Sequence, residues 1–203
     1  MNMPMKQRRG WRNLTIGLLV LGGLTTVDVA MAEGPRAKSA SAKRLASYQV
    51  PDVELIRADG ARVSLRREID DGRPVILNFI FTSCTAICPV MTQIFAQIQS
   101  RLGEERDKVH MISVSLDPEE DTPARLREYA GRFQAGAQWS FYTGTLENSL
   151  IAQKAFDAYR GNKMNHVPVT FLRLAPGRPW VRLEGFIKAD DVVQEYRQLL
   201  ATR

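Results

Sequence analysis

The sequence predicts an α/β sandwich, in which helices flank a mixed β-sheet. Segments 74–81 and 109–116 are nearly continuous apolar runs, which are typical of central strands buried on both faces. Helical patterns alternate with these strands, and a hairpin and a helix close the chain. The 203 residues are enough for one domain with a substantial core.

Each element has a local signal. The turn Ala58-Asp59-Gly60 predicts a β-hairpin, which forms an N-terminal extension of the sheet. Pro89 suits the first turn of a helix, where its missing N–H is not needed. Asp121-Thr122-Pro123 offers a cap and a helix start, and the turn 175–178 predicts a second hairpin. The predicted elements are strands 53–56, 63–65 and 74–81, helix 89–102, strand 109–116, a helix from 121–123 onward, strand 139–142, helix 146–159, strands 169–174 and 180–184, and helix 189–200.

The start of the chain has the parts of an export signal. Four basic residues precede an apolar stretch, 14–24, which is too short for a comfortable membrane span. Residues 30–32 read Ala-Met-Ala, the small-x-small pattern that signal peptidase requires. We expect a signal peptide over 1–32, with an uncleaved inner-membrane anchor as the alternative, and a periplasmic location. A flexible linker over 33–47 and a folded domain over 48–203 follow.

The charge distribution argues against a nucleic-acid partner. The formal net charge is +6, and removal of residues 1–32 lowers it to +3 because four basic residues and one acidic residue are lost. Much of the remaining excess lies in the linker, at Arg36, Lys38, Lys43 and Arg44. A basic patch of the kind that binds nucleic acid is not evident in the rest of the chain. We interpret the linker as a spacer near a membrane surface.

Both cysteines lie in one short motif, Cys84-Thr85-Ala86-Ile87-Cys88-Pro89. A disulfide-stapled scaffold would need more cysteines, and a structural disulfide around so small a loop would add little stability. Residues four apart share one face of a helix, so both sulfurs can reach one ion or each other. The start of the helix also lowers thiol pKa values. In an oxidising compartment, the motif predicts either a metal site or a redox couple.

Two thiolates and one imidazole would form a soft, three-coordinate site suited to Cu(I). Of the two histidines, His110 begins the strand 109–116, at the edge of the sheet that we expect to lie away from the cysteines. We interpret His110 as a surface or strand-end residue. His166 follows the polar loop 161–165, and a ligand role requires this loop to fold over the cysteines. The spacing alone leaves that point open.

Three sequence blocks resemble those of the SCO/SenC family and occur in the same order as in that family. The similarity runs from about Tyr48 to Leu200. The blocks are 79–89, with Cys-x-x-x-Cys-Pro, then 113–123, and then Asn165-His166 before a strand. The resemblance implies a thioredoxin-like fold that binds copper, as Cu(I) and also Cu(II), through Cys84, Cys88 and His166. It also implies a role in building the copper centre of a respiratory cytochrome c oxidase. The implied partners are the oxidase's copper-binding subunit and a periplasmic copper donor or thiol reductant.

Three residues near this expected site need separate interpretation. Asn165 stands where family members often have an acidic residue, so we expect different support for the imidazole. Pro168 lies where thioredoxin-like reductases carry a cis-proline, which keeps a redox role open; the alternative is a trans proline that begins a strand. Asp117 resembles a family position near the site. It either orders the loop or tunes a cysteine, or it is a turn residue.

Two functions are consistent with these observations. The first is a metallochaperone, not an enzyme, that hands copper to the oxidase by ligand exchange. The second is a thiol–disulfide oxidoreductase in which Cys84 attacks and Cys88 resolves, and which reduces the oxidase's copper-binding cysteines. Met91 and Met164 are interpreted as a core residue and a loop-surface residue, respectively, rather than as auxiliary copper ligands.

Overall fold

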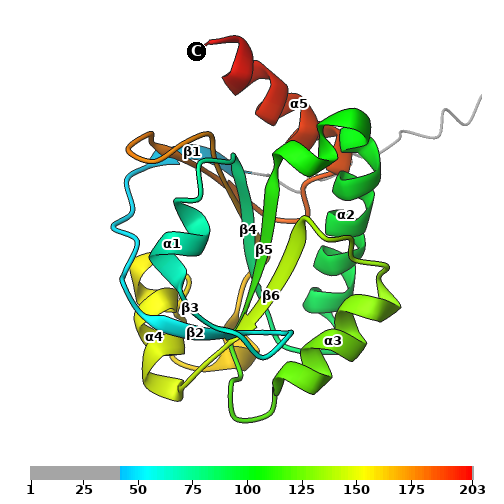
Figure 1. Ribbon diagram of the computed structural model, residues 1–203. Coiled ribbons are helices and arrows are strands. Elements are labelled where there is room, and N and C mark those ends of the chain that lie inside the picture. Colours follow the sequence, from blue (N-terminus) through cyan, green and yellow to red (C-terminus); the bar gives the residue numbers. More distant parts are fainter. Residues whose placement is uncertain (1–41, 203) are drawn as a thin grey trace, which may run out of the picture. The chain divides into compact units, whose positions relative to one another are not determined.

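The computed structural model describes residues 42–202. The expected signal peptide, 1–32, and the expected linker up to residue 41 lie outside the described residues. The described chain forms one eight-stranded mixed sheet with helices on both faces (Figure 1). The predicted α/β sandwich is therefore confirmed.

The sheet has the order β1-β8-β7-β4-β5-β6-β2-β3. The three central strands β4, β5 and β6 are parallel, and the strands on either side of them are antiparallel to their neighbours. The strands are β1 (Ala42–Ala46), β2 (Glu54–Arg57), β3 (Arg62–Ser64), β4 (Val75–Ile80), β5 (His110–Ser115), β6 (Trp139–Thr143), β7 (Val169–Arg173) and β8 (Trp180–Glu184).

Strands β4 and β5 form the centre of the sheet because every residue in both is buried. Two of their polar side chains pair with each other, since Ser113 donates a hydrogen bond to Asn78 Oδ1 across the two strands at 2.7 Å. Parallel pairing brings the carboxyl ends of the two strands to the same edge of the sheet. The cysteine loop follows β4 directly, so this edge positions the candidate site.

Five helices cover the sheet. In Figure 1, α1 and α4 lie on one side of the sheet, and α2, α3 and α5 lie on the other. Hydroxyl side chains cap three of them, since Ser64, Thr122 and Thr145 each accept a hydrogen bond from a backbone N–H in the first turn. The helices are α1 (Leu65–Ile69), α2 (Ile87–Leu102), α3 (Pro123–Arg132), α4 (Leu146–Ala155) and α5 (Ala189–Ala201), with the short 3-10 helices η1 (Gly103–Lys108) and η2 (Lys163–Asn165).

The largest difference from prediction is at the start of the domain. Residues 42–46, expected within the flexible linker 33–47, form strand β1. Their backbone pairs antiparallel with β8, from Ala42 opposite Glu184 to Ala46 opposite Trp180. The expectation was wrong for these residues because β1 is held by backbone pairing, while its side chains are largely exposed and carry no apolar pattern.

Two helix ends also differ from prediction. Helix α2 begins at Ile87 rather than at Pro89, so Cys88 lies inside its first turn. Helix α4 ends at Ala155 instead of 159, because Asp157 adopts a left-handed backbone with φ of 50°. The short helix α1 occupies Leu65, which was expected at the end of a strand. The β2–β3 hairpin and the other predicted strands and helices are confirmed within a few residues.

Among the described residues, no helix is both long and apolar enough to span a membrane.

Candidate metal centre

The cysteine motif occupies the junction between strand β4 and helix α2. Cys84 lies in the loop after β4 and is partly exposed, whereas Cys88 lies in the first turn of α2 and is 1% exposed. Both are free thiols. The N–H of Cys88 donates a hydrogen bond to Cys84 Sγ at 3.4 Å, across one turn. This contact keeps the two cysteines close to each other.

His166 completes a three-residue cluster with the two cysteines. One ligand atom from each of Cys84, Cys88 and His166 lies within 4.8 Å of the other two. Cys88 Sγ and His166 Nε2 lie 3.3 Å apart. The loop that carries His166 therefore folds over the cysteines, as a ligand role requires. The three groups form the one cluster of this kind found in the described part of the chain.

The imidazole of His166 is held in one tautomer. Its Nδ1–H donates to the carbonyl of Lys163 at 2.7 Å, which leaves the Nε2 lone pair directed at Cys88. Burial lowers the pKa of His166, although the Lys163 carbonyl raises it in part. The ring also packs edge-on against Phe81, with the centroids 5.1 Å apart. His166 therefore presents a neutral, oriented nitrogen that can bind a metal ion.

The two thiols differ in their electrostatic surroundings. Burial acts to raise the pKa of Cys84, but backbone N–H groups of Cys88, Ala86 and Ile87 stabilise its thiolate and bring the pKa below its usual value. Burial raises the pKa of Cys88 strongly, and the negative charges of Cys84 and Asp121 add to this. Cys84 is therefore the first of the pair to ionise.

Asp117 orders the loop that carries His166. Its carboxylate is buried and accepts a hydrogen bond from Lys163 Nζ at 2.5 Å. Since Lys163 O is the acceptor for His166 Nδ1, Asp117 anchors the residue that orients the imidazole. The Asp117 carbonyl also closes a turn by accepting from the N–H of Asp121 at 2.8 Å. Of the three sequence interpretations, these contacts match the turn residue and the loop-ordering residue, and Asp117 is not among the main groups that shift the pKa of either cysteine.

Sequence reasoning missed a buried carboxylate behind the cysteine loop. Of the two candidates for the cap of α3, Asp121 and Thr122, Thr122 is the cap, and Asp121 is fully buried. Asp121 accepts hydrogen bonds from Thr82 N at 3.1 Å, Thr82 Oγ1 at 2.6 Å and Ser115 Oγ at 2.6 Å. It thus fastens the start of the cysteine loop to the end of β5. Ser115, a hydroxyl inside an otherwise buried strand, was the sequence signal for such a partner.

A second missed contact supports the first turn of α2. Thr92 Oγ1 donates to the carbonyl of Cys88 at 2.8 Å and lies 2.8 Å from the hydroxyl of Tyr129 in α3. Burial raises the pKa of Tyr129 to about 12, so its hydroxyl keeps its proton. This chain of contacts couples the turn that carries Cys88 to helix α3.

The remaining candidates are not members of the three-residue cluster. The Asn165 side chain is exposed and donates to Arg160 O at 3.5 Å, and the Lys163 carbonyl accepts the hydrogen bond from the imidazole of His166. None of the described peptide bonds is cis, so Pro168 is a trans proline that precedes β7. Met91 is in the core and Met164 is 70% exposed, as expected.

His110 lies at the other end of the sheet from the cysteines. It begins β5, whereas the cysteine loop follows the end of the parallel strand β4. Its strand-end position is confirmed, but the expected surface location is wrong because His110 is 2% exposed. Its ring nitrogens have partners in α1 and β6, including Glu68 O and Ser140 Oγ.

Comparison with known families finds a match over most of the chain. A family model described as SCO1/SenC matches residues 42–201. The SCO1 protein homolog of Bacillus subtilis (strain 168) is 36% identical over 115 residues, which cover 55% of this chain and 58% of that protein. The mitochondrial protein SCO1 homolog 1 of Arabidopsis thaliana is 34% identical over 107 residues, covering 52% of this chain and 29% of that protein. The matched part of this chain therefore spans just over half the length of the Bacillus protein and less than a third of the length of the Arabidopsis protein.

Solved structures show the same fold. BsSco, described as a member of the Sco family of cytochrome c oxidase assembly proteins with a disulfide switch, is 28% identical, with a TM-score of 0.65 over 77% of this chain and 96% of that one. Copper-bound ScoI of Arabidopsis thaliana is 28% identical, with a TM-score of 0.60 over 71% of this chain and 96% of that one. Copper-bound yeast Sco1 is 20% identical, with a TM-score of 0.66 over 77% of this chain and 95% of that one. The fold is thioredoxin-like.

Proposed function

Since the chain belongs to the SCO1/SenC family, we propose that it is a copper metallochaperone that carries Cu(I) on Cys84, Cys88 and His166. The observation that carries this proposal is the convergence of two sulfurs and one oriented imidazole nitrogen within 4.8 Å. Two thiolates and a neutral imidazole form a soft donor set of low coordination number, which suits Cu(I). The copper-bound structure of a relative 28% identical supports the same cargo.

Protonation sets the order in which the ligands become available. Cys84 ionises first, and the neutral Nε2 of His166 already faces the cluster. Cys88, whose pKa is raised by burial, loses its proton as the ion binds, because metal ligation requires the thiolate. Cu(I) held by two thiolates and one neutral nitrogen gives a group with one net negative charge. Cu(II) on the same ligands would be neutral.

We propose that the ion is delivered to the copper-binding subunit of a cytochrome c oxidase by ligand exchange. The description of BsSco as an assembly protein for that oxidase supports this role. His166 is the ligand that can leave, since it follows the short helix η2 in a loop that one ion pair, from Lys163 to Asp117, fastens to the end of β5. A periplasmic copper donor supplies the ion, and a thiol reductant keeps the cysteines reduced. Residues 1–32 direct the chain to that compartment or anchor it there.

Titration of the reduced protein with Cu(I) tests the ligand set. We expect one ion per chain, a loss of binding in Cys84→Ala and Cys88→Ala, and about a tenfold or greater loss of affinity in His166→Ala. Asn165→Ala is the matched control, because Asn165 is the exposed neighbour of His166. If His166→Ala bound copper as tightly as the parent, with an unchanged spectrum, the ligand set would be wrong.

The unequal thiols support a second candidate, a thiol–disulfide oxidoreductase. In this reaction the Cys84 thiolate attacks a substrate disulfide and releases one thiol. Cys88, once deprotonated, displaces the second thiol from Cys84 and leaves a Cys84–Cys88 disulfide. The two electrons pass from the cysteine pair to the substrate, and a periplasmic thiol reductant must restore the pair. Fast turnover of a model disulfide together with negligible copper affinity would favour this function over copper transport.

A further inference from the structure

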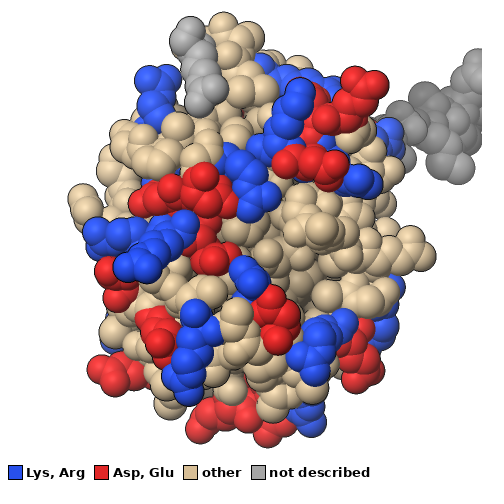
Figure 2. All heavy atoms as spheres, in the orientation of Figure 1, with Lys and Arg blue, Asp and Glu red and all other residues tan. Residues whose placement is uncertain are grey.

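A cavity of about 690 Å³ lies away from the metal centre. It is formed where β5 and β6 begin, between α1, the end of α3 and the β2–β3 hairpin, whereas the cysteines follow the end of β4. Figure 2 shows a hollow in this face, lined mainly by uncharged atoms and surrounded by charged side chains. The volume is within the range of roughly 300–1,000 Å³ that is typical of small-molecule sites.

Small residues keep this cavity open. Ala130 and Gly131 of α3, and Ala135 just after it, form one wall. A Cβ at Gly131 would meet nothing within 4 Å, and its backbone is outside the left-handed region that favours glycine. Glycine destabilises a helix relative to alanine, so neither conformation nor packing requires it here. Its effect is to leave space in the cavity.

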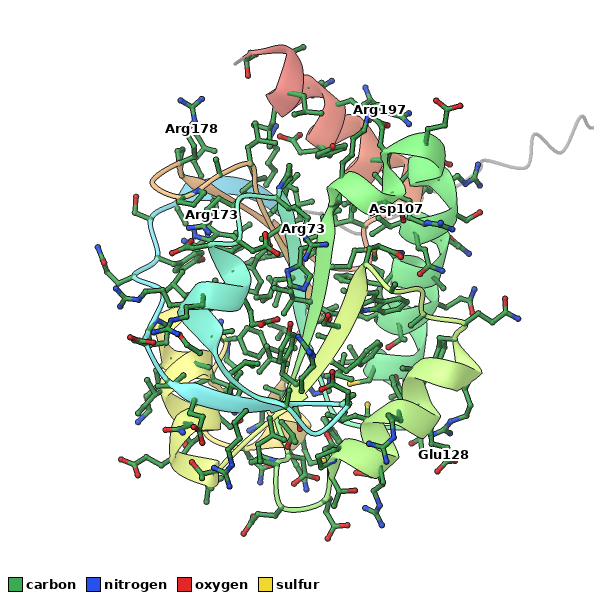
Figure 3. The ribbon with its side chains drawn as sticks, viewed as in Figure 1. Arg73, Asp107, Glu128, Arg173, Arg178 and Arg197 are labelled. Carbon is green, nitrogen blue, oxygen red and sulfur yellow. The ribbon has the colours of Figure 1, made fainter. Side chains whose placement is uncertain are left out.

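A buried polar group lies at the inner end of the cavity. The His110 side chain is buried, and its Nδ1 lies 3.0 Å from Asp71 Oδ2 and 3.0 Å from Glu68 O. Both partners are acceptors, so Nδ1 carries the proton, and Nε2 accepts from the Ser140 hydroxyl 3.3 Å away. Arg73, which lies between α1 and β5 (Figure 3), pairs with the same Asp71.

All but one of the charged side chains at the cavity have a partner of opposite charge, and this includes the lining carboxylate Glu68, whose Oε2 lies 3.6 Å from Arg57 Nη1. The guanidinium groups of Arg57 and Arg73 are paired with Asp59 and Asp71, at 2.7 and 2.6 Å. Arg127 instead donates to the carbonyl of Ala58 at 2.6 Å, and it forms no ion pair within residues 42–202. One positive charge at this cavity therefore has no carboxylate partner. A carboxylate can accept two parallel hydrogen bonds from such a group.

The remaining wall is aromatic. Trp139 and Phe141 of β6 line the cavity and are stacked, with ring centroids 5.0 Å apart and planes 30° apart. We propose that this cavity is a second ligand site, which binds a small organic anion with a flat apolar body, of the class of the aromatic monocarboxylates. Its carboxylate pairs with Arg127, and its body packs between the aromatic wall and the small residues of α3.

Binding of benzoate to the purified chain tests this site. We expect benzoate to bind at one site, with shifts confined to the amide signals around His110, Gly131 and Ser140. Benzyl alcohol has the ring without the charge and acetate has the charge without the ring, so each should bind at least about tenfold more weakly. Arg127→Gln should weaken benzoate about tenfold. Arg125→Gln, in the same helix but paired with Glu120, should not.

A cavity-filling variant separates this site from other binding modes. A Cβ at Gly131 meets nothing within 4 Å, so the Gly131→Leu variant should fold with a melting temperature no lower than that of the parent, and it should lose benzoate binding. His166→Ala should bind benzoate like the parent, which makes the result independent of the copper function. The proposal is overturned if benzoate does not bind at millimolar concentrations, if benzyl alcohol binds equally well, or if binding survives both Arg127→Gln and Gly131→Leu.

Discussion

Cys84 and Cys88 lie one helical turn apart, yet their surroundings displace their pKa values in opposite directions. Backbone N–H groups at the start of α2 point at Cys84, whereas Cys88 sits in the core beside His166. The same asymmetry serves both candidate functions. It supplies one thiolate that captures an ion or attacks a disulfide, and one thiol that reacts only afterwards.

Alkylation of the reduced protein measures this asymmetry. A lowered pKa means that the thiolate of Cys84 is present at lower pH, so its reaction with iodoacetamide should be half-maximal below the ordinary thiol value of about 8.5. Cys88 should react only well above that pH, because burial raises its pKa. Peptide mapping by mass spectrometry follows the two rates. Faster modification of Cys88 than of Cys84 at neutral pH would contradict the assignment.

Lys163 is expected to tune copper affinity without touching the ion. Lys163→Met removes the contact with Asp117 and frees the loop whose carbonyl orients His166. We expect Cu(I) affinity to fall about tenfold, in the range of changes to residues that support metal ligands. Competition with a Cu(I) chelator gives the affinities, and Lys108→Met in η1, at the other end of β5, is the control. Equal affinity of the two variants would exclude the positioning role.

The three candidate ligands could be named from sequence because their chemistry is rare. The chain has two cysteines and two histidines, and the family resemblance selected His166 between the latter. Their supporting residues could not be named in the same way. Asp117 and Lys163 are 46 positions apart, and Thr82 and Asp121 are 39 apart. Common charged and hydroxyl residues carry no local signal of such distant partners.

At the scale of elements, the loop from β4 to α2 depends on Asp121. Asp121→Ala would leave two hydrogen-bond donors of Thr82 and one of Ser115 without their acceptor in a buried region. We expect a loss of about 2–4 kcal/mol in the free energy of unfolding. Chemical denaturation measures it. Glu119→Ala, an exposed neighbour, should stay within about 0.5 kcal/mol of the parent, and a similarly small change for Asp121→Ala would refute the role.

Elements were predictable where burial leaves a mark in the sequence. Strand β4 is apolar throughout because both faces are covered, and helix α2 shows helical spacing because one face packs on the core. Strand β1 escaped prediction because its exposed Ala-Lys-Arg-Leu-Ala segment is ordered by backbone pairing with β8. The end of α4 was misplaced because the left-handed Asp157 is not a residue type that demands that conformation.

At the scale of the whole molecule, β1 forms one edge of the sheet. A chain that starts at Tyr48, the boundary expected from sequence, lacks β1 and exposes the edge of β8. It also loses the ion pair from Lys43 to Glu195 of α5. Relative to a chain that starts at Ala42, we expect the free energy of unfolding to fall by about 2–4 kcal/mol. Hydrogen exchange should show that β8 amides lose protection, and unchanged protection would argue against a structural role for β1.

The two ends of the parallel strands carry separate chemistry. The carboxyl ends of β4 and β5 hold the cysteines and the Asp121 network, and the opposite ends of β5 and β6 border the cavity around His110. The buried core of the sheet separates these two regions. Substitutions at one end are therefore expected to leave ligand binding at the other end unchanged.

X-ray absorption at the copper K-edge tests the central claim most directly. For the Cu(I)-loaded chain, the account predicts three ligands, two sulfurs and one imidazole nitrogen, with the nitrogen contribution absent in His166→Ala and kept in Asn165→Ala. A spectrum of the parent with two sulfurs alone, or one that His166→Ala leaves unchanged, would contradict it.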